Sequence, residues 1–146
     1  MRRSEDLDRI DGLVLPGGES TTMSLLLGSS GLVEPLADRL SDGLPAFGTC
    51  AGMILLATEV VDGRVDQYSF GVIDISVKRN AFGRQLQSFE TTLAVRHIDG
   101  APVPAVFIRA PAVVRTGPQV EILARVEVPG CGDETGPVVV CRQGAV

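Results

Sequence analysis

A cysteine between two glycines is the strongest candidate for chemistry in this sequence. Cys50 stands in the run FGTCAG (47–52), between a short apolar stretch that predicts a strand and an apolar stretch that predicts a helix. A nucleophile elbow has the pattern Gly-x-nucleophile-x-Gly, in which x is any residue. Here cysteine takes the position where many hydrolases carry serine. We expect glycines here because a strand-to-helix turn this tight leaves no room for side chains beside the nucleophile.

The expected position of Cys50 favours nucleophilic chemistry. Unpaired N–H groups and the helix dipole at a helix N-terminus stabilise the thiolate form of a cysteine. The N–H of Ala51 would point toward the oxyanion that forms when sulfur attacks a carbonyl group. A buried cysteine that packs between glycines is the other interpretation, and the local pattern alone leaves both open.

A loop with two consecutive glycines is the second candidate. The run PGGEST (16–21) follows an apolar stretch at 10–15 that predicts a strand. Two glycines let the backbone approach a ligand closely, and the carboxyl ends of parallel strands meet at one edge of a sheet. The loop could therefore supply a second oxyanion donor near Cys50. It lacks the lysine and the spacing of a phosphate-binding loop, and a β-turn with a helix cap explains it more simply.

The elements around these loops predict an α/β core with an antiparallel extension. In the first half we expect strands at 10–15 and 45–48, helices at 20–27 and 32–40, and a buried apolar helix at 51–60. Ser20, Thr21 and Thr22 are the expected caps of the first helix. In the second half we expect strands at 73–77, 89–95, 105–108, 120–126 and 138–141, and a loop at 129–137.

Composition excludes several classes of protein. The chain has 146 residues, 45% of them hydrophobic, which fits one globular domain. Its net charge of −5 and lack of a basic cluster argue against nucleic-acid binding. No apolar run approaches the roughly 20 residues of a membrane span, and the charged N-terminus does not resemble a signal peptide. Three scattered cysteines (Cys50, Cys131 and Cys141) favour the cytoplasm, and one histidine leaves no ligand set for zinc.

Several runs, in this order, resemble a known family. PGGESTT (16–22) followed by FGTCAG (47–52) resembles the class I (triad-type) glutamine amidotransferases. Within that class, RNAFGRQ (79–85), SFE (88–90) and FIRAP (107–111) are similar to the glutaminase subunits of pyridoxal 5'-phosphate synthase, the PdxT/SNO family. The resemblance covers nearly the whole chain. It implies a three-layer, flavodoxin-like α/β fold with a mixed sheet.

The resemblance also implies a reaction. Cys50 would attack the side-chain amide of L-glutamine, form a glutamyl thioester and release ammonia, with Gly18 and Ala51 as oxyanion donors. No cofactor or metal is implied, and the ammonia would pass to a synthase subunit, a TIM barrel of the PdxS type. Without the resemblance, Arg79 and Arg109 would be interpreted as surface charges at strand ends. The residues implied to bind glutamine are Gly18, Glu19, Ser20, Arg79, Ile108 and Arg109.

The chain departs from the family pattern at both ends. The family carries a catalytic His-x-Glu tract after the last strand and a first strand–helix unit, and neither is found here. We therefore expect a single incomplete glutaminase domain (1–146) with little or no activity. The one histidine, His97, is expected in a solvent-facing loop. Open alternatives are an amidotransferase of another pathway, an inactive module that only binds the synthase subunit, and a free-standing cysteine hydrolase.

Overall fold

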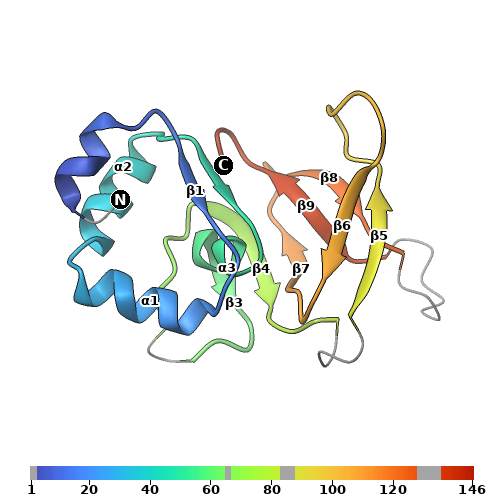
Figure 1. Ribbon diagram of the computed structural model, residues 1–146, viewed down its shortest axis with the longest axis horizontal. Helices are drawn as coiled ribbons and strands as arrows, with labels where there is room; N and C mark the ends of the chain where they lie inside the picture. Colours follow the sequence, from blue (N-terminus) through green and yellow to red (C-terminus); the bar gives the residue numbers. More distant parts are fainter. Residues whose placement is uncertain (1–2, 65–66, 83–87, 128–135) are drawn as a thin grey trace.

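The computed structural model describes residues 3–64, 67–82, 88–127 and 136–146 (Figure 1). Cys131 and most of the predicted loop at 129–137 lie outside these ranges. The first half contains η1 (Ser4–Arg9), β1 (Leu13–Leu15), α1 (Ser20–Ser29), α2 (Val33–Ser41), β2 (Ala46–Gly48), α3 (Ala51–Leu56) and β3 (Ala57–Val60). The second half contains β4 (Ile73–Lys78), β5 (Phe89–Leu93), β6 (Val103–Phe107), β7 (Ala112–Thr116), β8 (Glu121–Arg125) and β9 (Val138–Arg142).

The strands of the described ranges form three separately hydrogen-bonded sets. β1 and β2 pair in parallel, with Leu13 opposite Ala46. The largest sheet has the order β3-β4-β7-β9-β8, in which β3 and β4 are parallel and the other pairs are antiparallel. β5 and β6 form an antiparallel hairpin. The prediction of an α/β fold with a mixed sheet and an antiparallel extension is confirmed.

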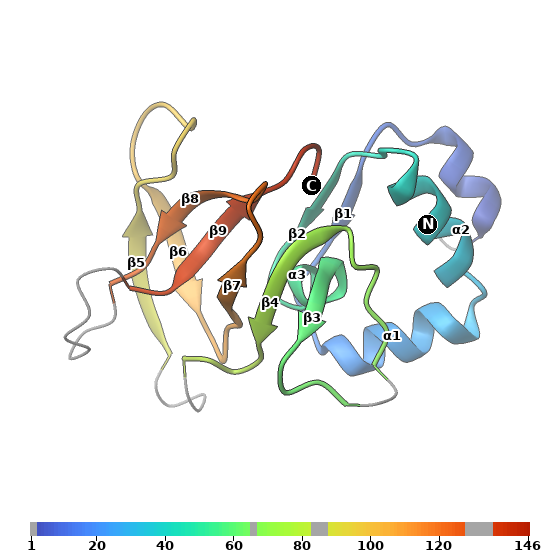
Figure 2. The same cartoon turned by 180° about the vertical axis from the view of Figure 1, so that it is seen from behind.

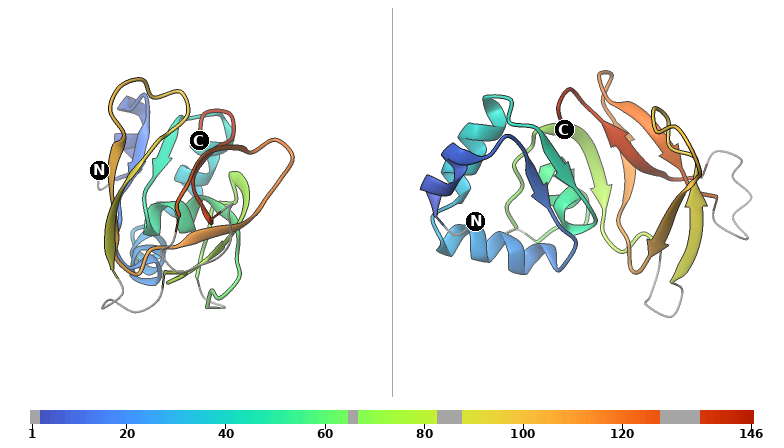
Figure 3. Two further views of the ribbon diagram at one scale, coloured as in Figure 1. Left: turned by 90° about the vertical axis from the view of Figure 1, so that its right-hand side faces the viewer. Right: turned by 45° about the horizontal axis from the view of Figure 1, so that its top comes forward.

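The two halves of the chain lie side by side, with β4 between them. Figures 1 and 2 show the helices with β1 and β2 on one side of β4, and the antiparallel strands β5 to β9 on the other. Figure 3 shows the C-terminus close to β2, where the Ala46 N–H donates to the Ala145 carbonyl oxygen (3.0 Å). The strand ends that carry the candidate residues therefore come from both halves.

Among the residues that the structure describes, two hydrophobic clusters stabilise the two halves of the chain. The larger gathers side chains from the helices and the parallel strands, including Leu36, Leu55 and Ile75, each with no exposed surface. The smaller lies around the β5–β6 hairpin, where the rings of Phe89 and Phe107 stack with centroids 4.9 Å apart. Burial of these apolar side chains is the main force that holds the strand ends in place.

The helix predicted at 51–60 is only partly correct. α3 is almost completely buried, as predicted, but it ends at Leu56, and β3 takes Ala57–Val60. Ala57 adopts an extended backbone, and the Thr58 hydroxyl donates to the Ile73 carbonyl oxygen (2.7 Å). Thr58 and Val60 are β-branched, so parallel pairing with β4 outweighs continuation of the helix.

The predicted caps of α1 are also wrong. The Glu19 carboxylate, rather than a serine or threonine side chain, accepts hydrogen bonds from the N–H groups of Thr21 (3.0 Å) and Thr22 (2.7 Å). Glu19 precedes the helix, so its carboxylate can fold back onto the free N–H groups of the first turn. No helix in the described part of the chain is long and apolar enough to cross a membrane.

Candidate functional site

Cys50 sits at a strained turn between β2 and α3. Its backbone has φ 52° and ψ −108°, a left-handed conformation that is uncommon for a residue with a Cβ. The turn is tied to the end of β1, because the Thr49 N–H donates to the Leu15 carbonyl oxygen (3.0 Å). Such strain persists only where the surrounding structure enforces it, and it is concentrated at functional sites.

The glycines on either side of Cys50 are required by space. A Cβ on Gly52 would lie 2.0 Å from the Leu15 carbonyl oxygen, and a Cβ on Gly48 would lie 2.6 Å from the Gly52 carbonyl carbon. The prediction that the turn leaves no room for flanking side chains is therefore confirmed. The start of α3 packs directly on the end of β1, which brings the diglycine loop to the cysteine.

The diglycine loop lies against Cys50. A Cβ built on Gly17 would be 3.4 Å from the Cys50 Cβ, so the loop backbone and the cysteine are in near contact. A cavity of about 130 Å³ opens at this contact, with Gly18, Ser20 and Cys50 among the residues that line it. Cys50 is half-buried and lines this cavity, so it is not enclosed on all sides by apolar packing.

Four strand ends meet around this cavity. The diglycine loop follows β1, Cys50 follows β2, and two further turns follow β4 and β6. The turns after β4 and β6 are joined by a hydrogen bond from the Ala81 N–H to the Ala110 carbonyl oxygen (3.0 Å). One predicted site residue, Ala51, has no exposed surface and does not line the cavity. The functional roles of all the predicted site residues remain predictions. The predicted residues on the wall are Gly18, Glu19, Ser20, Cys50, Arg79, Ile108 and Arg109.

Backbone strain is concentrated on the same wall. Within the described residues, four positions other than glycine have positive φ, and three of them line the cavity: Cys50 (52°), Asn80 (48°) and Arg109 (46°). Asn80 was not among the predicted site residues. The sequence signal that could have found it is an asparagine directly after the predicted strand and Arg79, because asparagine is one of the few residues that tolerate a positive φ.

The two arginines on the wall differ in their partners. The Arg79 side chain is 20% exposed, and its guanidinium donates to Gln67 Oε1 (3.0 Å) and lies 3.4 Å from Glu19 Oε1. Within the described ranges, no hydrogen bond or ion pair is found for the exposed Arg109 side chain. The wall thus offers one oriented guanidinium and one without a partner among the described residues, both suited to a carboxylate ligand.

Glu19 is held in its ionised form by the first turn of α1. Hydrogen bonds from the Thr22 side chain, the Thr22 N–H and the Thr21 N–H lower the pKa of Glu19 from 4.5 to about 2. The carboxylate is therefore charged at neutral pH. Because its oxygens already accept these bonds, it acts first as a helix cap.

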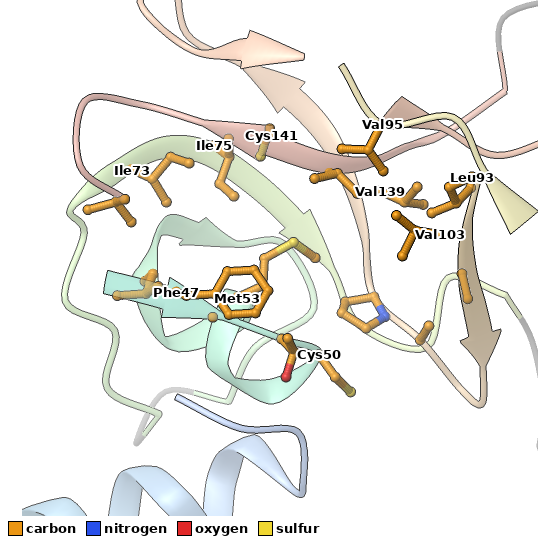
Figure 4. A pocket seen from close by; sticks show the side chains of 18 of the residues that line it. Phe47, Cys50, Met53, Ile73, Ile75, Leu93, Val95, Val103, Val139 and Cys141 are labelled. Carbon is orange, nitrogen blue, oxygen red and sulfur yellow. The ribbon is translucent and has the colours of Figure 1, made fainter. Parts of the chain in front are cut away.

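Cys50 also lines a second, larger cavity, whose other lining residues are mostly apolar. It has a volume of about 410 Å³ and lies between the β2–α3 turn and the antiparallel strands. Figure 4 shows Phe47 and Met53 on one side of it and Val95, Val103 and Val139 on the other. Cys141 also lines this cavity, and burial raises the pKa of its thiol to about 11. A thiol of that kind is a poor nucleophile at neutral pH.

His97 lies away from the small cavity. Its side chain is 56% exposed in a turn after β5, as the loop prediction required, and His97 Nε2 is 2.7 Å from Glu121 Oε1. It is not among the residues that line the cavity. In the part of the chain that the structure describes, no group of three or more His, Cys, Asp or Glu side chains could hold a metal ion.

Comparisons with known proteins agree with this arrangement. The model of the SNO glutamine amidotransferase family matches residues 1–146. The chain is 59% identical to the pyridoxal 5'-phosphate synthase subunit PdxT of Rhodococcus jostii, over all of this chain and 72% of that protein. It is 55% identical to the same subunit of Acidothermus cellulolyticus, over all of this chain and 69% of that protein.

A solved structure described as a glutamine amidotransferase has the same fold. It superposes with a TM-score of 0.84 at 42% identity, over 99% of this chain and 71% of the other. The family model covers every residue, and the relatives are similar over the full length of the chain. The chain therefore belongs to the SNO glutamine amidotransferase family.

Proposed function

We propose that the chain acts as the glutaminase subunit of a pyridoxal 5'-phosphate synthase, hydrolysing L-glutamine to glutamate and ammonia through a thioester on Cys50. The observation that carries this proposal is the strained Cys50 on the wall of a cavity that Arg79 and Arg109 share. The relatives that are PdxT subunits of the synthase support the same assignment.

The cavity suits the two ends of an amino acid. Arg79 and Arg109 would bind the α-carboxylate of glutamine, and the ionised Glu19 on the same wall would pair with the α-ammonium group. This arrangement would hold the side-chain amide at Cys50. Gly18 belongs to the loop that lies against the cysteine, so its N–H is a candidate donor to the developing oxyanion.

The chemistry follows from this placement. The Cys50 thiolate forms a bond to the amide carbon, and the carbonyl electron pair moves to oxygen, where the Gly18 N–H would stabilise it. The Ala51 N–H, the other predicted donor, belongs to a residue without exposed surface and would reach the oxyanion only if the turn shifts. Collapse of this intermediate breaks the C–N bond, and the nitrogen leaves as ammonia after taking up a proton. Water then attacks the thioester, which releases glutamate and restores the thiol.

The described wall of the cavity lacks an effective general base for proton transfer. Glu19 is the only carboxylate on the described wall, and a group with a pKa of about 2 is a poor general base. His97 is paired with Glu121 elsewhere on the surface. We therefore expect slow turnover in the chain of 146 residues, while glutamine binding and the reactivity of Cys50 persist.

The ammonia would pass to a synthase subunit of the TIM-barrel, PdxS type. The names of the PdxT relatives, which describe a subunit, support a partner of this kind. We place the reaction in the cytoplasm, where a nucleophilic thiol stays reduced. A module that only docks on the synthase would need neither a strained cysteine nor arginines around it, so the site favours the enzyme.

Affinity labelling of Cys50 tests this function without requiring turnover. The probe is a chloroketone that carries the α-amino and α-carboxylate groups of glutamine, and labelled peptides are quantified by mass spectrometry. We expect saturable labelling of Cys50, protection by L-glutamine but not by D-glutamine, and much slower labelling of Cys141. Non-saturable labelling, or equal protection by both enantiomers, would contradict the proposal.

A further inference from the structure

One connecting segment holds both ends of Arg79. The segment runs between β3 and β4, and its Asp62 Oδ1 accepts a hydrogen bond from the Arg79 backbone N–H (2.8 Å). Gln67, on the same segment, accepts a hydrogen bond from Arg79 Nη1 at its Oε1 (3.0 Å). The position of the residue and the direction of its side chain are therefore set by the same part of the chain.

The described part of this connection that follows Gln67 is fixed to the helices that border the site. The Tyr68 N–H donates to the Ser24 hydroxyl oxygen in α1 (2.7 Å), and the Phe70 N–H donates to the Leu55 carbonyl oxygen in α3 (2.6 Å). α1 begins at the diglycine loop, and α3 begins directly after Cys50. Gln67 is thus held in a constant position relative to the nucleophile.

Gln67 makes the shortest contact with the Arg79 guanidinium. The contacts with Glu19 (3.4 Å) and Thr21 Oγ1 (3.5 Å) are longer, and the Glu19 carboxylate already accepts the hydrogen bonds that cap α1. A neutral carbonyl oxygen directs the guanidinium without neutralising its charge. Apart from the longer ion pair with Glu19, the positive charge of Arg79 is therefore not neutralised by Gln67, and it can bind a ligand that carries a carboxylate.

The other end of the Gln67 amide is not satisfied. Its Nε2 is buried and has no hydrogen-bond partner among the described residues. A buried donor without an acceptor is unfavourable for folding, so each such group requires an explanation. The contact of the Gln67 carbonyl oxygen with Arg79 gives a functional reason for an amide here.

We propose that Gln67 is a positioning residue, which directs the Arg79 guanidinium into the cavity so that it binds the α-carboxylate of L-glutamine. The inference rests on the proposed function. Gln67 does not line the cavity, so it acts only through Arg79. Its loss is therefore expected to weaken the binding of ligands with an α-carboxylate and to spare ligands without one.

Protection of Cys50 from iodoacetamide measures this selectivity in the 146-residue chain. The rate of alkylation of the Cys50 peptide is followed by mass spectrometry at increasing concentrations of L-glutamine, or of the analogue in which hydrogen replaces the α-carboxylate. For Gln67→Met we expect the Kd of L-glutamine to rise about five- to tenfold, with no change for the analogue. Gln67→Asn, whose shorter side chain withdraws the acceptor, should show the same selective loss.

A double-mutant cycle tests whether Gln67 acts through Arg79. Arg79→Ala should weaken the binding of L-glutamine, and adding Gln67→Met to it should cause no further loss. Additive effects, an unchanged Kd in Gln67→Met, or equal losses for both ligands would overturn the inference alone. If L-glutamine fails to protect Cys50 in the unmodified chain, that result would contradict both the proposed function and this inference.

Discussion

Gly52 and Leu15 pack so closely that a Cβ on Gly52 would come within 2.0 Å of the Leu15 carbonyl oxygen. This contact brings the first turn of α3 against the end of β1. It therefore places the nucleophile turn beside the diglycine loop. A side chain at position 52 would have to separate the two elements that form the cavity.

Gly52→Ala is expected to destabilise the protein by about 1–3 kcal/mol, because overpacking a buried contact forces the backbone apart. Gly28→Ala is the matched control: it lies in α1 with nothing within 4 Å of a built Cβ, so alanine should stabilise the helix by up to about 1 kcal/mol. Urea unfolding of both variants measures the difference. Equal stability of Gly52→Ala and the unmodified chain would contradict the close packing.

Glu19 predicts a pH-dependent contribution to stability. Its pKa is lowered in the folded state from 4.5 to about 2, so its contribution is fully present above pH 4.5 and is lost as the pH falls through about 2. Glu19→Ala should cost about 1 kcal/mol at neutral pH, as loss of a helix cap usually does. The difference in unfolding free energy from the unmodified chain should shrink over that window.

Thr22→Val tests the cause of that shift. The Thr22 hydroxyl gives the largest contribution to lowering the pKa of Glu19, through a hydrogen bond of 2.8 Å. Its removal should raise the pKa of Glu19 and move the loss of stability to higher pH. A pH profile that is identical in Thr22→Val and the unmodified chain would show that the hydroxyl does not hold the carboxylate.

Arg109 is expected to bind the ligand carboxylate together with Arg79. Asparagine tolerates the positive φ of this position, so Arg109→Asn removes the guanidinium and preserves the turn. The Kd of L-glutamine should rise roughly ten- to a hundredfold, since a hydrogen bond to a charged group contributes about 1.5–3 kcal/mol. Arg115→Ala is the control, because Arg115 pairs with Asp74 (2.5 Å) and does not line the cavity. Equal losses in the two variants would contradict the assignment.

His97 is expected to have no part in the reaction of Cys50. His97→Asn removes the imidazole, keeps a residue that tolerates the positive φ of this position, and should change the rate of Cys50 alkylation less than about twofold, because the side chain lies outside the cavity. Imidazole added to the buffer should raise ammonia release by the 146-residue chain, since it supplies the base that the described wall lacks. A strong loss of alkylation in His97→Asn would assign the histidine to the site.

The site was easier to predict from the sequence than its surroundings. The glycines around Cys50 and in the loop at Gly17 are required by local steric limits, which the sequence shows directly. The structure brings both runs together at one cavity. Arg79 and Arg109 were predicted by family resemblance alone, because a charge at a strand end has no pattern of its own. Gln67 and Asn80 were missed because their importance depends on contacts and strain that form only in the fold.

The strand pairing could not be predicted to the same degree. Ala57–Val60 follows α3 directly, with no glycine or proline to mark the end of the helix, and only pairing with β4 makes it a strand. β7 was missed because Ala112–Thr116 lacks the alternation of a half-exposed strand, with two adjacent buried residues at its start. The division into three hydrogen-bonded sets is a property of long-range contacts, which local sequence patterns do not encode.

The most direct test of the central claim is to trap the acyl-enzyme. The chain is mixed with saturating L-glutamine, quenched in acid and digested, and the Cys50 peptide is examined by mass spectrometry. A glutamyl group in thioester linkage on Cys50, absent from Cys50→Ala and enhanced by imidazole, is the predicted result. No glutamyl adduct on Cys50 with or without imidazole, or an adduct on another residue instead, would contradict the account.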